Sequence, residues 1–260
     1  MTNQRTTFLM YHEIEAAGRA LCDAEPGYVR YVVSQAAFRD QLGQLRGDGY
    51  GGLSVGQWLA GSQAGPAAVI TFDDGCETDA LIAAPLLAAA GFQATFYVIA
   101  GRVGQRGYLS AAQLRELSAA GFEIGCHSMT HRYLDEADDA QLRVEVNEAK
   151  ARLEQITGTE IVHFSCPGGR YSRRVAQWAA RAGYRSVATS RIGANTPASS
   201  RLNLARVAVL RDYDGGTFAR LVRGEGLAAR RARAGLLNAA KTILGNRAYE
   251  RVRARVLDQG

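Results

Sequence analysis

Short runs of β-forming residues alternate along most of the chain with segments that have the apolar spacing of amphipathic helices. This alternation constrains the fold most, because strands separated by helices of roughly 10–20 residues pair in parallel through βαβ units. Strands are predicted at 8–11, 67–72, 94–99, 122–125, 161–164, 185–189 and 207–210. Helices are predicted at 34–47, 81–90, 110–121, 138–157 and 173–182.

About seven parallel strands predict an α/β fold in which the sheet curls into a distorted or incomplete (β/α) barrel. An open doubly wound sheet stays the alternative. However, no G-x-G-x-x-G motif follows a strand, so a dinucleotide-binding fold lacks its main support. The chain has 260 residues, which is enough for one large domain. We expect this domain to occupy residues 1–215.

Residues 216–260 differ from the rest because they are predicted to be helical throughout and are rich in arginine. Basic amphipathic helices either dock onto their own domain or lie on an anionic membrane surface, and docking is the preferred interpretation here. The net charge of +6 permits an anionic partner without identifying one. Nucleic acid is not expected, because no aromatic ladder or basic groove motif accompanies the charge.

The four cysteines form no C-x-x-C pair, which argues against a structural zinc ribbon, and nothing in their spacing indicates a disulfide framework. The N-terminus has no long apolar segment of the kind found in secretory signals. The longest apolar stretch, 80–92, contains Pro85 and is too short to span a bilayer. We therefore expect a cytoplasmic protein, peripheral at the inner membrane face if the basic tail contacts lipid.

Three polar clusters each follow a predicted strand. The residues Asp73-Asp74-Gly75 follow the first of these strands, the sequence HSMTH at 127–131 follows the second, and PGGRY at 167–171 follows the third. Because the carboxyl ends of parallel barrel strands share one face, where active sites lie, we expect the three clusters to converge.

Two of the four histidines, His127 and His131, are spaced so that both imidazoles would face one point from a helical turn. Two imidazoles and one carboxylate are a common ligand set for a catalytic divalent metal. A second, adjacent carboxylate can then accept a proton from water. The alternative is a solvent-exposed histidine pair beside an ordinary Asp-Asp turn. We favour the metal site because both motifs stand at strand ends.

The sequences TFDDG at 71–75, HSMTH at 127–131 and CPGGRYS at 166–172 resemble, in order and spacing, the first three motifs of the polysaccharide deacetylase family. Members of that family share the NodB homology domain and form carbohydrate esterase family 4. The segments LMYH at 9–12 and 38–50 resemble the N-terminal strand and helix of an exopolysaccharide-type subgroup. The resemblance extends over residues 8–215 and implies a (β/α) barrel.

The resemblance implies hydrolysis of an N-acetyl group on an acetylated amino sugar, either in a polysaccharide or in a lipid-linked saccharide. Asp74, His127 and His131 match the family's metal ligands, and we expect zinc, with cobalt or nickel as alternatives. Asp73 matches the general base, which takes a proton from water held by the metal. The backbone N–H at Gly168 matches the donor that stabilises the oxyanion.

The acid that protonates the leaving amine is a late histidine in much of the family, but no histidine follows His163 here. By resemblance to the exopolysaccharide subgroup, His12 is expected to replace it or to contact the substrate. Ser165 stands where the family has an arginine that orients the base. Arg170 and Arg185 are the two residues considered as replacements for that arginine.

Arg170 and Tyr171 are also expected to contact the substrate beside the third motif, with Tyr171 suited to stack on a sugar ring. No clear equivalent of the family's fourth motif lies near 186–191. Two alternatives therefore stay open: an amidohydrolase acting on a small non-sugar amide, and a carbohydrate-binding pseudoenzyme. His163, inside an apolar strand, is expected to be a core residue.

Overall fold

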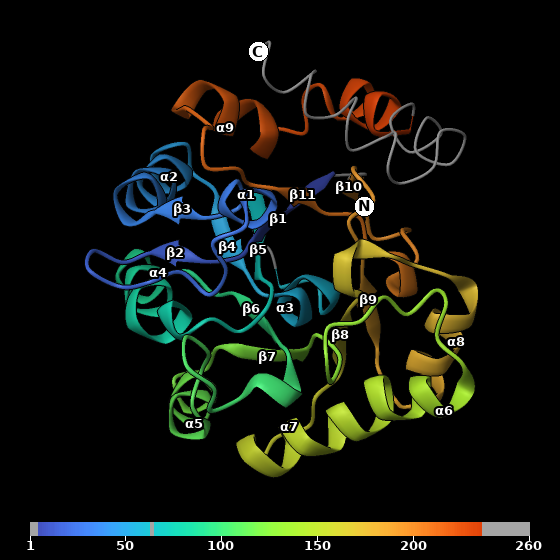
Figure 1. Cartoon of the computed structure of the whole chain (residues 1–260). Coiled ribbons are helices and arrows are strands. Elements are labelled where there is room, and N and C mark those ends of the chain that lie inside the picture. Colours follow the sequence, from blue (N-terminus) through green and yellow to red (C-terminus); the bar gives the residue numbers. More distant parts are fainter. Residues whose placement is uncertain (1–4, 63–64, 236–260) are drawn as a thin grey trace.

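The computed structural model describes residues 5–62 and 65–235, and every structural statement below refers to those residues. Its main sheet contains a run of parallel neighbours that curls into an incomplete barrel with helices outside it (Figure 1). In spatial order these strands are β11 (Val207–Ala208), β1 (Thr6–Tyr11), β5 (Ala67–Phe72), β6 (Thr95–Val98), β7 (Glu123–Cys126), β8 (His163–Ser165) and β9 (Ser186–Ala188). This arrangement confirms the predicted seven-stranded parallel (β/α) fold.

Four short strands complete the described sheets. They are β4 (Gly51–Leu53), β10 (Ala194–Asn195), β2 (Ile14–Glu15) and β3 (Val33–Ser34). Strand β4 pairs with the first half of β5, β10 runs antiparallel to the start of β1, and β2 and β3 form a separate sheet. The sequence did not predict these strands, because segments of two or three residues are too short for a recognisable apolar alternation.

The helices begin and end at the residues that their capping chemistry favours. Ser34 and Ser110 accept hydrogen bonds from the first turns of the helices that follow them. Gly91 and Gly158 end two helices in the left-handed conformation. The α-helices are α1 (Pro26–Val29), α2 (Gln35–Gly47), α3 (Val55–Leu59), α4 (Ala84–Ala90), α5 (Ala111–Ala119), α6 (Asp139–Leu142), α7 (Ala149–Thr157), α8 (Arg173–Arg181) and α9 (Gly215–Val222).

Two predicted helices contain a π-helical turn. Residues Asp79–Ala83 precede α4 in this conformation, and residues Arg143–Glu148 join α6 to α7. Such turns carry one extra residue and are often found at functional sites, because they turn particular side chains out of the regular helical spacing. Both of these segments lie close to the polar clusters described below.

Aromatic side chains from neighbouring strands pack in a row beneath the helices. Phe72 stacks on Tyr11 at a centroid distance of 5.3 Å and on Phe96 at 5.0 Å. Phe122 meets the edge of Phe96 at 5.5 Å. All of these rings are buried, and each offset or edge-to-face pair adds about 0.5–1.5 kcal/mol to the free energy gained from burial. Two of the strands that carry these rings, β1 and β5, lead into polar residues described below.

The first part of the basic tail docks on the domain. Helix α9 contacts α2 and β1, and its residues Phe218 and Leu221 are buried in the main core, as is Leu227 in the next helical segment. Residues 236–260, which carry five of the ten basic residues of the predicted tail, lie outside the described part of the chain, so the expected membrane contact stays a prediction. Among the described helices, none is both long enough and apolar enough to cross a bilayer.

Candidate active site

The carboxyl ends of adjacent parallel strands bring the predicted residues to one edge of the sheet. Tyr11 of β1 lies opposite Phe72 of β5, so the residues that follow them, His12 and Asp73, emerge at the same level. The Asp73 N–H donates to the Tyr11 carbonyl at 3.0 Å, which extends this pairing by one residue. His127 emerges directly after β7, where its N–H donates to a β6 carbonyl.

Asp74, His127 and His131 converge as the sequence predicted. The Asp74 Oδ1 atom lies 3.6 Å from His127 Nε2 and 3.4 Å from His131 Nε2. The three ligand atoms all lie within 4.8 Å of one another, which is the spacing expected around a single ion. Asp73 Oδ2 is next to them, 3.9 Å from His127 Nε2.

A loop, rather than the expected helical turn, brings the two histidines together. Residues 127–131 are not helical, and Ser128 and His131 both have positive φ angles, of 68° and 65°. These left-handed residues bend the chain back, and the Ser128 hydroxyl accepts a hydrogen bond from the His131 N–H. Asp74 is also left-handed, with φ 80°. Non-glycine residues adopt this conformation at a cost, and such strain concentrates at functional sites.

Glu145 stabilises this histidine loop from below. Its buried carboxylate accepts hydrogen bonds from the N–H groups of Met129 and Thr130 at 3.0 and 2.9 Å, and from the Thr130 hydroxyl. Glu145 belongs to the π-helical turn between α6 and α7, which directs its side chain toward the loop. Sequence analysis did not identify this residue, because one glutamate within a helical pattern carries no distinguishing signal.

The three converging residues have the chemistry that a divalent cation requires. The His127 Nδ1 atom lies 2.9 Å from the Ser165 carbonyl, so Nδ1 carries the proton and Nε2 is left as a ligand. Asp74 Oδ1 is buried and has no hydrogen-bond partner in the described structure. Burial raises the pKa of Asp74 to about 6 and lowers the pKa of His127 to about 3. An uncharged imidazole and an unsatisfied carboxylate oxygen fit a divalent ion such as zinc.

Asp73 is held differently from its neighbour, by an ion pair with Arg206. The guanidinium donates two parallel hydrogen bonds of 2.7 Å to the two carboxylate oxygens. Burial by itself would raise the pKa of Asp73, but the positive charge of Arg206 outweighs burial and holds this pKa well below its usual range. The two adjacent carboxylates therefore differ in partner and in the direction in which their pKa values are shifted.

Arg206 corrects the expectation that Arg170 or Arg185 orients Asp73. The Arg170 guanidinium lies 3.3 Å from Asp135 instead, and Arg185 pairs with Glu160 at the surface. Arg206 directly precedes β11, which pairs with β1 beside β5 and so brings the guanidinium under Asp73. A charged residue at the start of a predicted strand was the available sequence signal, but the strand order was needed to interpret it.

His12, which is the predicted acid, lies at the same edge of the sheet. Its ring lies 4.7 Å from the ring of Tyr31, and its Nδ1 atom is buried without a hydrogen-bond partner in the described structure. His12 directly follows β1, which pairs with β5, so the His12 imidazole and the Asp73 carboxylate emerge from neighbouring strand ends. His163 lies elsewhere, buried between Glu123 and Ser186, and this confirms its predicted core position.

The third motif forms a tight turn at the mouth of this cluster. Gly168 has φ 59°, and a Cβ atom there would lie 2.6 Å from the Tyr133 ring, so both its conformation and its surroundings favour glycine. The Arg170 guanidinium covers the other part of that ring at 4.1 Å from its centroid. Tyr171 is half-buried and packs against the main core. Gly168, Arg170 and Tyr171, which were predicted to contact the oxyanion or the substrate, thus lie together in the turn that follows β8.

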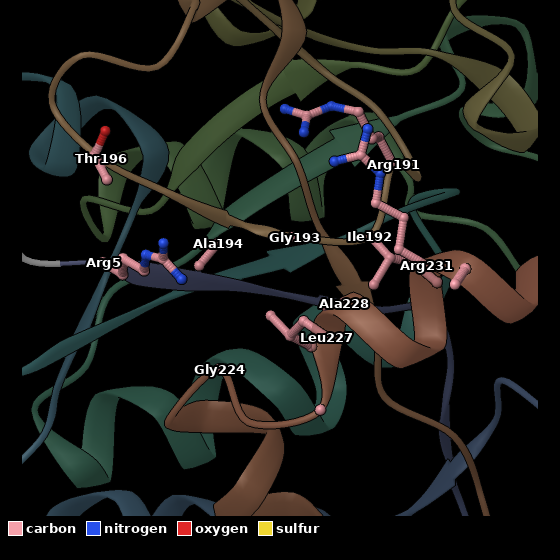
Figure 2. A pocket seen from close by; sticks show the side chains of 12 residues that line it. Arg5, Arg191, Ile192, Gly193, Ala194, Thr196, Gly224, Leu227, Ala228 and Arg231 are labelled. Atoms are coloured by element: carbon pink, nitrogen blue, oxygen red, sulfur yellow. The ribbon is translucent and has the colours of Figure 1, made fainter. Parts of the chain in front are cut away.

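A cavity of about 710 Å³ lies away from this cluster, at the junction of the tail and the start of β1 (Figure 2). Its lining includes Arg5, Arg191 and Arg231, whose guanidinium groups surround small residues such as Gly193. It shares no residue with the Asp74, His127 and His131 cluster. Its size therefore gives no reason to place the reaction there.

Comparison with known proteins agrees with the geometry. Residues 60–187 match the family model named polysaccharide deacetylase. The chain is 28% identical over 150 residues to YxkH of Bacillus subtilis, which is assigned by name to the polysaccharide deacetylases, covering 58% of this chain and 54% of that protein. It is 34% identical over 119 residues to a peptidoglycan-N-acetylglucosamine deacetylase of Bacillus cereus, covering 45% and 54%.

The chain thus spans about half the length of the curated relatives it matches. Among solved structures, the Streptococcus pyogenes deacetylase PplD in complex with acetate superposes with a TM-score of 0.74 and 25% identity, over 85% of this chain and 99% of that one. The family model, the relatives and the fold all indicate the same assignment. Residues 60–187 belong to the polysaccharide deacetylase family, whose domain is also called the NodB homology domain.

Proposed function

We propose that the protein is a metal-dependent hydrolase that removes N-acetyl groups from an acetylated amino sugar, in a polysaccharide or a lipid-linked saccharide. The observation that carries this proposal is the convergence of Asp74, His127 and His131, with Asp73 fixed beside them. The names of the relatives, which refer to acetylated polysaccharide and peptidoglycan, support the choice of substrate class.

Asp74 Oδ1, His127 Nε2 and His131 Nε2 would hold the ion, and zinc is the first choice for two imidazoles and a carboxylate. The chemistry that such an ion supplies when bound is polarisation of a carbonyl oxygen and acidification of water. Three ligands from the protein leave further coordination positions for substrate and water, as catalytic sites require.

Asp73 would accept the proton of the attacking water. Its depressed pKa favours the ionised form, and Arg206 fixes the plane of its carboxylate beside His127. A base that is already charged and oriented loses no free energy to reorganisation during the reaction. The backbone N–H at Gly168 would donate to the negative oxygen that develops when the amide is attacked.

His12 would donate a proton to the departing amine. An amine is a poor leaving group unless it is protonated, so the reaction needs an acid within reach of the amide nitrogen. The buried Nδ1 of His12 has no hydrogen-bond partner among the described residues, and His12 follows the strand next to the one that leads into Asp73. Arg170 and Tyr171, at the mouth of the cluster, would contact the sugar.

The decisive experiment combines elemental analysis with acetate release from a panel of N-acetylglucosamine oligomers. Wild-type protein is expected to bind about one equivalent of metal and to release acetate. Asp73→Asn is expected to keep the metal and lose acetate release, whereas His127→Ala is expected to lose both. His163→Gln, altered outside the cluster, is the matched control and should keep both.

Each competing function predicts a different outcome. Metal binding without acetate release from any acetylated saccharide would indicate a carbohydrate-binding pseudoenzyme. Hydrolysis of a cyclic ureide in preference to the saccharides would indicate an amidohydrolase of small substrates. Wild-type acetate release by Asp73→Asn would contradict the assignment of Asp73 as the base.

A further inference from the structure

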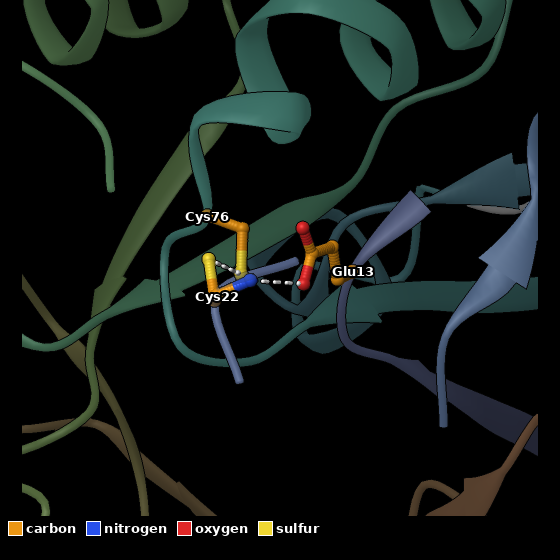
Figure 3. A group of neighbouring side chains, drawn as sticks. All are labelled: Glu13, Cys22 and Cys76. Carbon is orange, nitrogen blue, oxygen red and sulfur yellow. Dashed lines mark hydrogen bonds between the residues drawn. The ribbon is translucent and has the colours of Figure 1, made fainter. Parts of the chain in front are cut away.

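Cys22 and Cys76 are 54 residues apart in the sequence, yet their sulfur atoms lie 3.2 Å apart (Figure 3). Cys22 belongs to the segment that follows β2, and Cys76 comes directly after the Asp73-Asp74-Gly75 turn. Both are unbridged thiols. A disulfide bond of about 2.05 Å would require the two sulfur atoms to approach by only about a further 1.2 Å.

The surroundings hold the two thiols in this arrangement. The Cys22 N–H donates to Glu13 Oε2 at 2.9 Å, and the Cys22 thiol donates to the Gly107 carbonyl at 3.0 Å. The Tyr28 hydroxyl lies 3.0 Å from the same Glu13 oxygen and 3.3 Å from Cys76 Sγ. Cys76 is further fixed by a backbone bridge to Tyr108. The approach of the two sulfurs therefore belongs to the folded network and does not depend on one exposed loop.

The same geometry favours sulfur–sulfur chemistry over a second metal site. Two thiolates bound to one tetrahedral zinc at about 2.3 Å lie about 3.8 Å apart, which is wider than the separation found here. The Glu13 Oε2 atom that would complete such a site is already engaged by Cys22 and Tyr28. Each of these polar groups has a partner without an ion.

One thiol of the pair is accessible and the other is not. Cys22 is partly exposed, whereas Cys76 is fully buried. A cavity of about 240 Å³ opens beside them, and its lining includes Glu13 and Gly107, the two residues that contact Cys22. A small oxidant can therefore approach the Cys22 side, and Cys76 is then positioned to complete the reaction from within.

We propose that Cys22 and Cys76 form a redox-active dithiol that a low-molecular-weight disulfide converts to an intramolecular disulfide bond. The Cys22 thiolate attacks one sulfur of that reagent and expels one thiolate, which forms a mixed disulfide at Cys22. The Cys76 thiolate then attacks Cys22 Sγ and expels the second thiolate. The two cysteines lose two protons and two electrons, and the reagent is reduced to two thiols.

The bond would join two segments that carry active-site residues. Cys76 lies two residues beyond Asp74, and Glu13, which holds Cys22, lies next to His12. Oxidation would therefore link the segment that follows His12 to the turn that carries Asp73 and Asp74. Because the linkage closes a long loop, the oxidised protein is expected to melt about 5–15 °C above the reduced protein.

The test treats the folded, full-length protein with oxidised glutathione and measures thiols, mass and melting temperature. Wild-type protein is expected to lose two of its four thiols and the mass of two hydrogens, and a Cys22–Cys76 cross-linked peptide should appear after digestion without reductant. Cys76→Ser is expected to stop at one glutathione adduct on Cys22. Cys22→Ser is expected to form neither product.

A double variant, Cys126→Ser with Cys166→Ser, is the matched control, because these two thiols are buried elsewhere, and it should still form the bond. The proposal is overturned if folded wild-type protein keeps all four thiols, if it stops at the glutathione adduct, or if the bond forms only in denaturant. The proposal would also be overturned if the wild-type protein bound a second equivalent of zinc and Cys22→Ser did not. None of these measurements depends on deacetylase activity, so failure of either proposal leaves the other unaffected.

Discussion

Arg206 and Asp73 form a bidentate ion pair in which neither side chain exceeds 4% exposure, although the two residues are 133 positions apart in the sequence. The planar guanidinium matches the planar carboxylate, so the pair fixes the orientation of Asp73 as well as its charge. A buried pair of this kind is strongly destabilised when one partner is removed, because the other is left charged and unpaired. The variants of Arg206 therefore test both roles.

Replacing Arg206 with methionine is expected to raise the pKa of Asp73, because burial then acts without the opposing charge. Activity that requires ionised Asp73 would then be lost at a higher pH as the solution is acidified, so the acidic limb of kcat/KM moves upward in pH. The free energy of unfolding should fall by about 3–5 kcal/mol. Arg206→Lys keeps the charge but not the paired contacts, and kcat should fall about 100-fold.

Arg170→Met and Arg185→Met are the controls for charge removal, because neither guanidinium touches Asp73. Both are expected to leave the acidic limb of the profile in place. An unshifted limb in Arg206→Met, measured on protein that circular dichroism reports as folded, would contradict the role given to Arg206.

Replacing His12 with glutamine is expected to lower acetate release from amide substrates by about 10²–10⁴-fold, the range typical for loss of a general acid. The same variant should retain much more of its activity on an aryl acetate ester, since a phenolate leaves without protonation. Metal content should not change. Steady-state rates on the two substrate classes give the comparison, and equal losses on both would argue that His12 does not act as the acid.

Replacing Glu145 with alanine is expected to loosen the histidine loop, because two N–H groups and one hydroxyl lose their acceptor. Interactions that orient metal ligands are typically worth about 10–100-fold in metal affinity, and a loss of that size is expected here. Glu145→Gln keeps one acceptor oxygen, so its metal affinity should lie between that of the wild-type protein and that of Glu145→Ala. Competition with a chelator measures this affinity, and unchanged binding in both variants would separate Glu145 from the metal site.

Metal binding is expected to weaken as the pH falls below about 6, because the Asp74 carboxyl must lose its proton to act as a ligand and burial has raised its pKa to about 6. The loss should be about tenfold per pH unit. His127 does not limit binding in this range, since its pKa is lowered to about 3. Titration of zinc at pH 5, 6 and 7 tests this, and an affinity that stays flat across the series would contradict it.

In the metal-free protein, the raised pKa of Asp74 makes the free energy of unfolding decrease, rather than increase, as the pH rises. Asp74 is protonated more readily when folded than when unfolded, so its contribution to stability is present at low pH and is lost as the pH rises through about 6. Bound metal should reverse this trend, because it stabilises the ionised carboxylate. Thermal melts of the two forms across this pH range should therefore separate as the pH increases, and parallel curves would be inconsistent with Asp74 as a ligand.

The sequence by itself was sufficient to predict the alternating strands and helices and the chemistry of the Asp74, His127 and His131 cluster. Strand 67–72 was predicted with the bounds that the structure has, and the helices predicted from residues 34 and 110 begin at the caps Ser34 and Ser110. Apolar spacing and caps are local properties, so a single chain reveals them. The Asp-Asp and His-x-x-x-His patterns could be recognised for the same reason, because each is confined to a few neighbouring residues.

Tertiary structure decided which distant side chains complete the cluster. Arg206 reaches Asp73 only because β11 pairs with β1, and Cys22 reaches Cys76 only because the segments after β2 and β5 fold against each other. The loop conformation of 127–131 likewise depends on Glu145, which lies outside it. Such partnerships are set by strand register and packing between segments far apart in the chain, and no local pattern records them.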